Sequence, residues 1–246
     1  MKLFRELILS ASGKAAIVLG GGPSCPSDFS RVREAFPDAV KISANLHGFK
    51  LTDCDYIVSV DDELKQKRDA AGITAPFISY HSWAEYRLVE FPHFSESGIY
   101  AAWIAWNLGA CPILLCGMGC YSEGATYFHD ADAFSPGNRI PVDSHVRAWM
   151  KLHKTLPAPV PVRAVSGPLV NVFGAYDPKE SFADYPVPER LSLLNRHEGV
   201  LIRVTRSCRI LGERFEPGQV VEVCKSDAQT LLRQKRAVKV RPQTLN

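Results

Sequence analysis

Short apolar runs alternate along the chain with longer segments in which apolar residues recur at helical spacing. The short runs are bounded by Gly, Pro and Asp, which is typical of buried strands. We expect strands at residues 15–20, 39–44, 56–60, 76–79, 112–116 and 160–165, and helices at 26–36, 61–71, 97–108 and 142–156. Strands that alternate with helices predict an α/β fold, with a doubly wound, mostly parallel Rossmann-like sheet.

The segment SGIYAAWIAWNLG is the clearest of the predicted helices. Ser97 is a suitable N-cap, and Gly109 can adopt the left-handed conformation that ends a helix. The segment is apolar nearly all round, so we expect it to be buried against the sheet. Trp103, Trp106 and Trp149 are predicted to be core residues.

The character of the chain changes near Gly199. Residues 199–246 carry ten Lys or Arg and four acidic residues, a net charge of +6, whereas the whole chain is +3, which leaves −3 for the first 198 residues. This asymmetry indicates a separate module. We expect a nucleotide-binding domain at 1–176, a Pro-rich linker at 177–198 and a small basic α+β module at 199–246, with strands at 200–205, 220–223 and 237–240, a helix at 226–233 and a turn at 215–219.

The composition is that of an ordinary globular protein, 46% hydrophobic and 22% charged. No apolar run approaches the roughly 20 residues of a membrane span. Arg5 and Glu6 interrupt the first apolar patch, so we do not expect a signal peptide and predict a cytoplasmic protein. The seven cysteines form no CxxC pair, and we expect reduced thiols rather than a metal site.

The first predicted strand ends in Gly20-Gly21-Gly22-Pro23-Ser24. Glycines allow a ligand to approach the backbone closely, and the N-terminus of the next helix favours an anion such as phosphate. The segment matches neither GxGxxG nor GxxxxGK[ST], so the NAD and P-loop patterns are absent. A phosphate-binding loop and a plain strand-to-helix turn both remain open from this segment alone.

Polar residues follow three of the predicted strands: Asn45, Asp61 and Tyr121. In an open α/β sheet, ligands bind at the carboxyl ends of the strands. We therefore expect these side chains to surround one crevice, with Asp61 as a candidate ribose or metal contact. Helix capping alone would also explain Asp61.

Four segments occur in a recognisable order: VLGGGPS, ISAN, SGIYAAWIAWNLGACPILLCGMGCY and EGATY. In these segments the chain resembles bacterial lipooligosaccharide sialyltransferases and the wider group of Rossmann-like proteins with a GxGPS loop, which includes pterin pyrophosphokinase-like proteins. The resemblance covers roughly residues 14–170. It implies a metal-independent glycosyltransferase that uses a CMP-sugar donor, transfers the sugar with inversion to a hydroxyl acceptor, and needs no other cofactor.

The resemblance also implies roles for individual residues. The nucleotide contacts would come from the glycine loop, from the Asn after the second strand and from the start of the buried helix: Gly20, Gly21, Gly22, Ser24, Asn45 and Ser97. Tyr121 and Tyr127 would donate hydrogen bonds to the leaving phosphate, where other enzymes use a metal. His145 would be the general base.

The sequence departs from the family at Gly119, where an Asp is usual, and at Leu46, where a Gln is usual. His129 is a rival for the base; with Asp130 and Asp132 it could also ligate a metal, but the three are too close in sequence for a complete site.

The C-terminal module is similar to small domains of tailed-phage proteins, which implies a phage or prophage origin. If the protein is phage-encoded, we expect it in the host cytoplasm. A non-catalytic phage nucleotide-binding or assembly protein and a pterin pyrophosphokinase relative are the alternatives. The expected partners are a nucleotide-sugar donor and a glycan or other hydroxyl acceptor, with a homo-oligomer or virion protein as further candidates. Nucleic acid is not expected, because no aromatic platform accompanies the basic residues.

Overall fold

The computed structural model describes residues 2–92, 94, 96–122, 127–130, 140–186, 188, 199–210 and 213–240. Its main element is a sheet of eight strands in the order β1-β6-β5-β4-β3-β2-β7-β8, with every neighbouring pair parallel. The strands are β1 (Lys2–Leu3), β2 (Ala16–Leu19), β3 (Val40–Ala44), β4 (Tyr56–Val58), β5 (Phe77–Ser79), β6 (Tyr86–Arg87), β7 (Ile113–Cys116) and β8 (Val162–Ala164).

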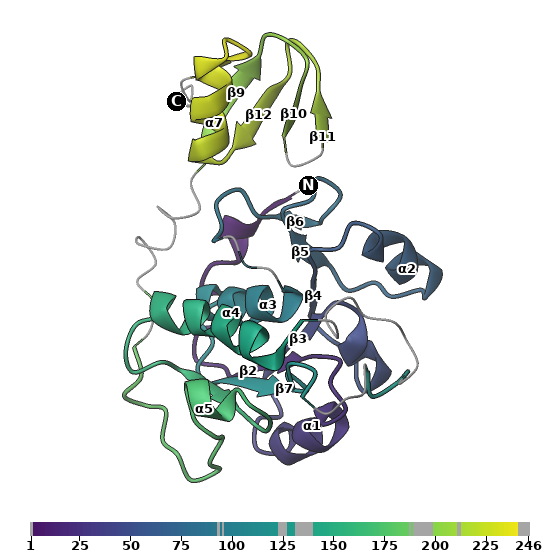
Figure 1. Ribbon diagram of the computed structural model, residues 1–246, viewed down its shortest axis with the longest axis vertical. Coiled ribbons are helices and arrows are strands. Elements are labelled where there is room, and N and C mark those ends of the chain that lie inside the picture. Colours follow the sequence, from purple (N-terminus) through teal and green to yellow (C-terminus); the bar gives the residue numbers. More distant parts are fainter. Residues whose placement is uncertain are drawn as a thin grey trace.

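Helices cover both faces of this sheet (Figure 1). The helices are α1 (Cys25–Arg33), α2 (Leu64–Ala70), α3 (Ser97–Asn107), α4 (Val142–Thr155) and α5 (Val170–Phe173), with short 3₁₀ helices η1 (Phe4–Leu7) and η2 (His47–Lys50). Ala16 and Val18 of β2 belong to the hydrophobic cluster that contains α3, whereas Ile17 and Leu19 belong to the cluster that contains α1. The predicted α/β fold with a parallel sheet is confirmed.

The direction of the chain across the sheet reverses beside β2. From β2 the chain adds β3, β4, β5 and β6 on one side, and α3 then returns it to β7 on the other side of β2. The connections that follow β2 and β7 therefore diverge to opposite faces. Such a switch point leaves a crevice at the carboxyl ends of the strands, where α/β proteins bind ligands.

Helix α3 is buried along nearly its whole length, as its composition predicts. It ends at Asn107 with Leu108 as its C-cap residue, and the φ of +82° at the next residue, Gly109, confirms the expected left-handed stop. The prediction that Ser97 caps this helix is wrong. Glu96 is the N-cap residue, with extended φ and ψ of −134° and 137°, while the Ser97 hydroxyl accepts a hydrogen bond of 3.2 Å from the Val60 N–H.

The remaining predicted helices and strands have the expected type, and their ends lie within about three residues of the predicted ones. Helix α2 begins at Leu64 rather than at Asp61, because Glu63 is its N-cap residue. The edge strand β1 and its neighbour β6, of two residues each, were not predicted from the sequence. Trp103, Trp106 and Trp149 lie in the core, as expected. Within the part of the chain that the structure describes, no helix is both long enough and apolar enough to span a membrane.

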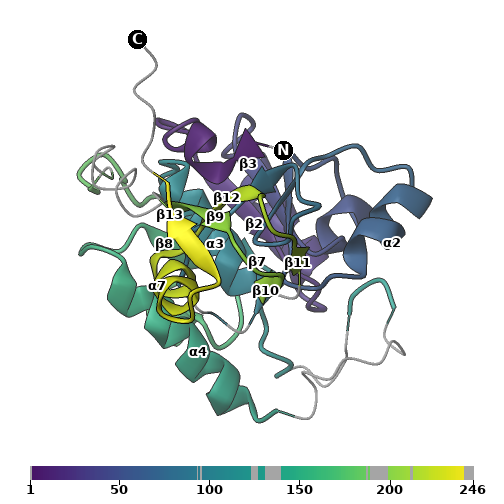
Figure 2. The same cartoon turned by 90° about the horizontal axis from the view of Figure 1, so that it is seen from above.

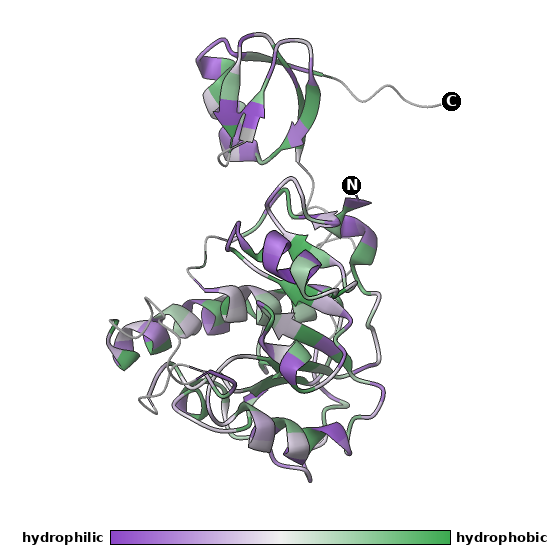
Figure 3. Cartoon of the chain, turned by 90° about the vertical axis from the view of Figure 1, so that its right-hand side faces the viewer, coloured by the Kyte–Doolittle hydropathy of each residue, from purple (hydrophilic) through white to green (hydrophobic). Residues whose placement is uncertain are grey.

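Residues 200–239 form a second, smaller body with its own hydrophobic core. Strands β12 (Val220–Val223), β9 (Val200–Val204) and β13 (Ala237–Lys239) form an antiparallel sheet, β10 (Cys208–Ile210) and β11 (Glu213–Phe215) form a hairpin, and α7 (Lys225–Arg233) covers the sheet. We call this body the C-terminal module. Hydrophilic and hydrophobic residues alternate along it at the top of Figure 3.

The C-terminal module lies over the main domain, as Figure 2 shows from above. Arg5 forms an ion pair of 2.9 Å with Glu222, and the Lys225 N–H donates to the Glu90 carboxylate. The predicted linker lies partly outside the described residues. Its first part is tied to β8 of the main domain, because Arg163 Nε donates a hydrogen bond of 2.8 Å to Glu180.

Candidate functional site

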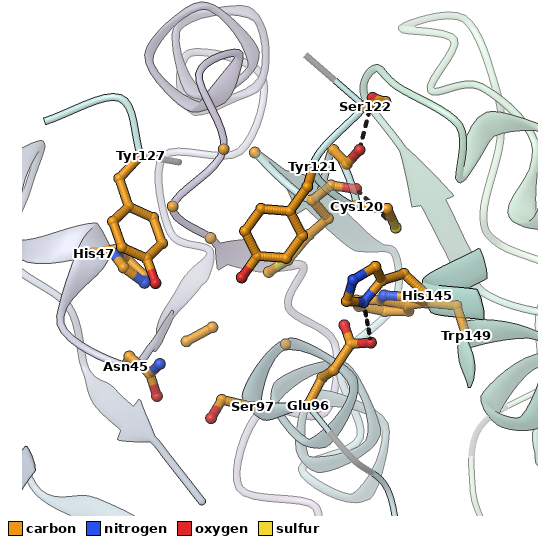
Figure 4. A pocket seen from close by; sticks show the side chains of 18 of the residues that line it. Asn45, His47, Glu96, Ser97, Cys120, Tyr121, Ser122, Tyr127, His145 and Trp149 are labelled. Carbon is orange, nitrogen blue, oxygen red and sulfur yellow. Dashed lines mark hydrogen bonds and ion pairs between the residues drawn. The ribbon is translucent and has the colours of Figure 1, made fainter. Parts of the chain in front are cut away.

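The carboxyl ends of β2, β3, β4 and β7 meet around one cavity of about 410 Å³, which the start of α3 and one face of α4 also line (Figure 4). Every predicted site residue except Ser24 is part of its wall. These residues, scattered over more than half of the chain, are Gly20, Gly21, Gly22, Asn45, Asp61, Ser97, Tyr121, Tyr127 and His145.

The three glycines of the loop after β2 are required by close contacts within the protein. A Cβ atom on Gly20 or Gly22 would lie 2.7 or 2.6 Å from the main-chain oxygen of Gly117 in the loop after β7. A Cβ atom on Gly21 would lie 2.5 Å from the Tyr127 ring. Close packing of two loops therefore explains Gly20 and Gly22, and Gly21 makes room for an aromatic ring on the cavity wall.

Ser24 lies at the N-terminus of α1 and is not part of the cavity wall. Its hydroxyl is buried and has no hydrogen-bond partner among the described residues, and it does not cap the helix. The start of α1 is held instead by Asp28, whose carboxylate accepts hydrogen bonds from the Gly117 N–H at 3.0 Å and the Ser166 hydroxyl at 2.8 Å. The structure therefore places the predicted nucleotide contact of Ser24 outside the cavity.

Asn45 is held in the left-handed conformation at the end of β3, with φ of +57°. Its side-chain oxygen Oδ1 is buried and has no hydrogen-bond partner in the described part of the chain. A buried acceptor without a donor is costly, so a ligand that supplies an N–H or O–H would be bound favourably here. Partial desolvation raises the pKa of Asp61, although a hydrogen bond from Asn45 opposes the rise.

The loop after β7 carries unusual backbone angles. Gly117, Cys120 and Tyr121 have φ of +66°, +51° and +60°, and the Ser122 hydroxyl donates a hydrogen bond of 2.7 Å to the Gly119 carbonyl. Left-handed angles at non-glycine residues cost about 1–3 kcal/mol each, and such strain clusters at ligand sites. Here the strain places the Tyr121 ring over the cavity (Figure 4).

Tyr127 lies opposite Tyr121, in a segment that is docked on the glycine loop. The Phe128 N–H donates a hydrogen bond of 2.9 Å to the Gly21 carbonyl, and the Tyr127 ring lies 4.4 Å, centroid to centroid, from the His47 ring. The hydroxyl groups of Tyr121 and Tyr127 point into the same space, next to Asn45 and Ser97, in Figure 4. The two phenols are thus placed to donate hydrogen bonds to one ligand.

His129 is not part of the cavity wall. Its Nε2 lies 2.9 Å from Nδ1 of His47, and burial together with this neighbour lowers the pKa of His47 to about 4. His47 is a wall residue that the sequence did not indicate. Asp132, which the sequence grouped with His129 and Asp130, lies outside the described residues. Among the described residues no group of three His, Cys, Asp or Glu side chains could hold a metal ion.

His145 projects from α4 and is 4% exposed. Its Nδ1 lies 2.8 Å from Oε1 of Glu96, and its ring centroid lies 5.1 Å from that of Tyr121. Glu96 was not among the predicted site residues. The sequence offered one indication of Glu96, its position directly before a predicted helix. Acidic residues are favoured at that position by the helix dipole alone, so the position does not identify a site residue.

The described residues of the cavity wall include the carboxylates of Asp61 and Glu96 but no Lys or Arg. Burial, and to a smaller extent the charge of Glu96, raises the pKa of Cys120 to about 12, so this thiol stays neutral. The cavity thus combines neutral donors, two carboxylates and imidazoles. It is suited to moving a proton and to binding a ligand of low negative charge.

Comparison of this chain with protein-family models, with curated proteins and with solved structures finds no match.

Proposed function

We propose that this protein is a glycosyltransferase of the sialyltransferase type, which transfers a sugar from a CMP-sugar to a hydroxyl acceptor with inversion. One observation carries the proposal. Tyr121, Tyr127 and His145, the catalytic residues implied by the resemblance, line one cavity with the glycine loop and Asn45. In the cell, we place this reaction in the cytoplasm.

The proposed reaction is a single displacement. His145 takes the proton of the acceptor hydroxyl, and the acceptor oxygen forms a bond to the anomeric carbon of the donor. The bond from that carbon to the phosphate oxygen breaks, and its electron pair leaves with CMP. Tyr121 and Tyr127 donate hydrogen bonds to the phosphate as its negative charge grows, so they stabilise the transition state more than the ground state.

The charge of the cavity wall supports a monophosphate rather than a diphosphate nucleotide. A CMP-sugar carries one negative charge on its phosphodiester, whereas UDP-sugars and ATP carry more. The described wall offers no Lys or Arg but two carboxylates, Asp61 and Glu96. Burying additional phosphate charge beside these groups would be unfavourable.

Asn45 supports a nucleoside ligand. Its buried Oδ1 needs a donor, which an exocyclic amino group or a ribose hydroxyl would supply. Asp61 lies on the same wall and can accept a hydrogen bond from a second hydroxyl.

The test is release of CMP from a panel of CMP-activated sugars by the wild-type protein and by variants. We expect the Tyr121→Phe, Tyr127→Phe double variant to lower kcat by about 100-fold or more, in line with the loss of preorganised donors in other enzymes. The Tyr86→Phe variant is the matched control, since Tyr86 is half-buried on β6 away from the cavity.

Full activity of the double variant would refute the role given to the phenols. Absence of CMP release together with tight nucleotide binding would favour the alternative of a non-catalytic phage nucleotide-binding or assembly protein. Turnover of ATP with a pterin would favour a pyrophosphokinase relative.

A further inference from the structure

The buried imidazole of His145 is bound to a carboxylate that lies on a different helix. His145 comes from the first turn of α4, and Glu96 is the residue directly before α3. The Nδ1–Oε1 distance of 2.8 Å is that of a strong, charge-assisted hydrogen bond. We propose that Glu96 is the positioning residue of His145, which fixes the tautomer of the imidazole and stabilises the imidazolium that forms in the reaction; this inference rests on the proposed function.

The hydrogen bond decides which ring nitrogen carries the proton. An ionised carboxylate can only accept, so Nδ1 must donate. In the neutral imidazole the proton is then on Nδ1, and Nε2 is left with the lone pair that a general base needs. Without Glu96 both tautomers become accessible, and the tautomer with its proton on Nε2 cannot act as the base through that nitrogen.

Glu96 lies at a place in the fold that favours negative charge. Glu96 is the N-cap residue of α3, a helix of 11 residues, and the positive end of the helix dipole favours a carboxylate there. Its side chain is 28% exposed, so water also solvates the charge. The carboxylate makes no capping hydrogen bond to α3, which leaves it available to His145.

The packing around His145 limits its rotation. The residue is 4% exposed, the Tyr121 ring lies 5.1 Å away, and Trp149 lies one helical turn further along α4 with 1% exposure. These neighbours restrict the rotation of the imidazole. When the acceptor proton moves to Nε2, the resulting positive charge lies against the carboxylate of Glu96, which stabilises the imidazolium.

The experiment compares Glu96→Gln with Glu63→Gln. Glu63 is the N-cap residue of α2 and also makes no capping hydrogen bond, so its variant controls for loss of a carboxylate at a helix N-terminus. The ¹⁵N chemical shifts of His145 in the free protein report the tautomer without any substrate. We expect the Nδ1–H tautomer in the wild type and in Glu63→Gln, and a mixture of tautomers in Glu96→Gln.

In the transfer reaction we expect Glu96→Gln to lower kcat about 100-fold with little change in KM, and Glu96→Asp, which keeps the charge, to recover part of the loss. An unchanged tautomer in Glu96→Gln, or a wild-type imidazole protonated on Nε2, would overturn the inference. So would a kcat for Glu96→Gln equal to that of Glu63→Gln. If the wild type releases no CMP, the proposed function fails, and the tautomer spectrum still decides the pairing of Glu96 with His145.

Discussion

At the scale of single residues, the glycine loop shows how one sequence feature can have two physical causes. Gly20 and Gly22 lie against the main chain of Gly117, whereas Gly21 lies under the side chains of Tyr127 and His47. The contacts of Gly20 and Gly22 stabilise the fold, whereas the contact of Gly21 shapes the cavity. A substitution by alanine should therefore act differently at neighbouring positions.

We expect Gly22→Ala to destabilise the protein by about 1–3 kcal/mol, because the Gly117 main chain cannot move away without disturbing the sheet. Gly21→Ala should cost less stability, since side chains can rotate, but it should displace Tyr127 and weaken nucleotide binding. Thermal unfolding and calorimetric titration of each variant measure the two effects. Equal loss of stability in both variants, with nucleotide affinity unchanged in Gly21→Ala, would show that the distinction is wrong.

The lowered pKa of His47 predicts a pH dependence of stability. Its pKa falls from 6.5 to about 4 on folding, mainly because of burial. Between these values the unfolded chain binds a proton at His47 and the folded protein does not. The stability that depends on neutral His47 is therefore fully present above pH 6.5, and the free energy of unfolding decreases as the pH falls toward 4. Urea unfolding at several pH values should show a shallower decline below pH 6.5 for His47→Gln than for the wild type. The same substitution at His153 on α4 is the control, and parallel curves for wild type and His47→Gln would count against the assignment.

At the scale of elements, one buried carboxylate joins α1 to the loop after β7, which lines the cavity, and to the loop after β8. Asp28 is 2% exposed and accepts hydrogen bonds from Gly117 after β7 and Ser166 after β8. The helix thereby fixes the position of the loop that carries Tyr121. Stability and site geometry are coupled at this residue.

We expect Asp28→Ala to lower the free energy of unfolding by about 2–5 kcal/mol, because two donors lose their buried acceptor. Asp28→Asn keeps one acceptor oxygen and should lose less. Asp38→Ala, at an exposed position after the same helix, should change stability by less than about 0.5 kcal/mol. Urea unfolding measures all three, and an Asp28→Ala variant as stable as Asp38→Ala would exclude this role.

The order of elements could be predicted from the sequence because the central strands and α3 have strong local patterns. A two-residue strand such as β6 has no such pattern and is defined by its pairing with β5 and β1. Asn45 could be placed at the cavity because it follows a strand. The pairing of Glu96 with His145 could not, since it joins residues 49 positions apart through the packing of α3 and α4.

Ser97 illustrates the same limit. A serine before an apolar helix predicts an N-cap, yet the hydroxyl binds the Val60 N–H at the end of β4. The neighbouring strand end offers a main-chain donor that no local pattern could reveal. Tertiary contact, rather than helix propensity, therefore decided the partner of this side chain.

At the scale of the whole molecule, a parallel sheet with a cavity at its switch point carries a module with a separate core. The Arg5–Glu222 ion pair and the contact between Lys225 and Glu90 join the two, and the residues involved do not line the cavity. We therefore propose that the main domain, and not the basic module, binds the nucleotide.

We propose that the cavity binds cytidine monophosphate in preference to nucleotides with more phosphate charge. Isothermal titration of the full chain with CMP, UDP and ATP under identical conditions tests this preference most directly. We expect saturable binding of CMP, with affinity at least about tenfold higher than for UDP or ATP, which corresponds to about 1.4 kcal/mol. We also expect this preference to weaken in the Tyr121→Phe, Tyr127→Phe variant. Equal or tighter binding of UDP or ATP, or no binding of CMP, would contradict the proposal.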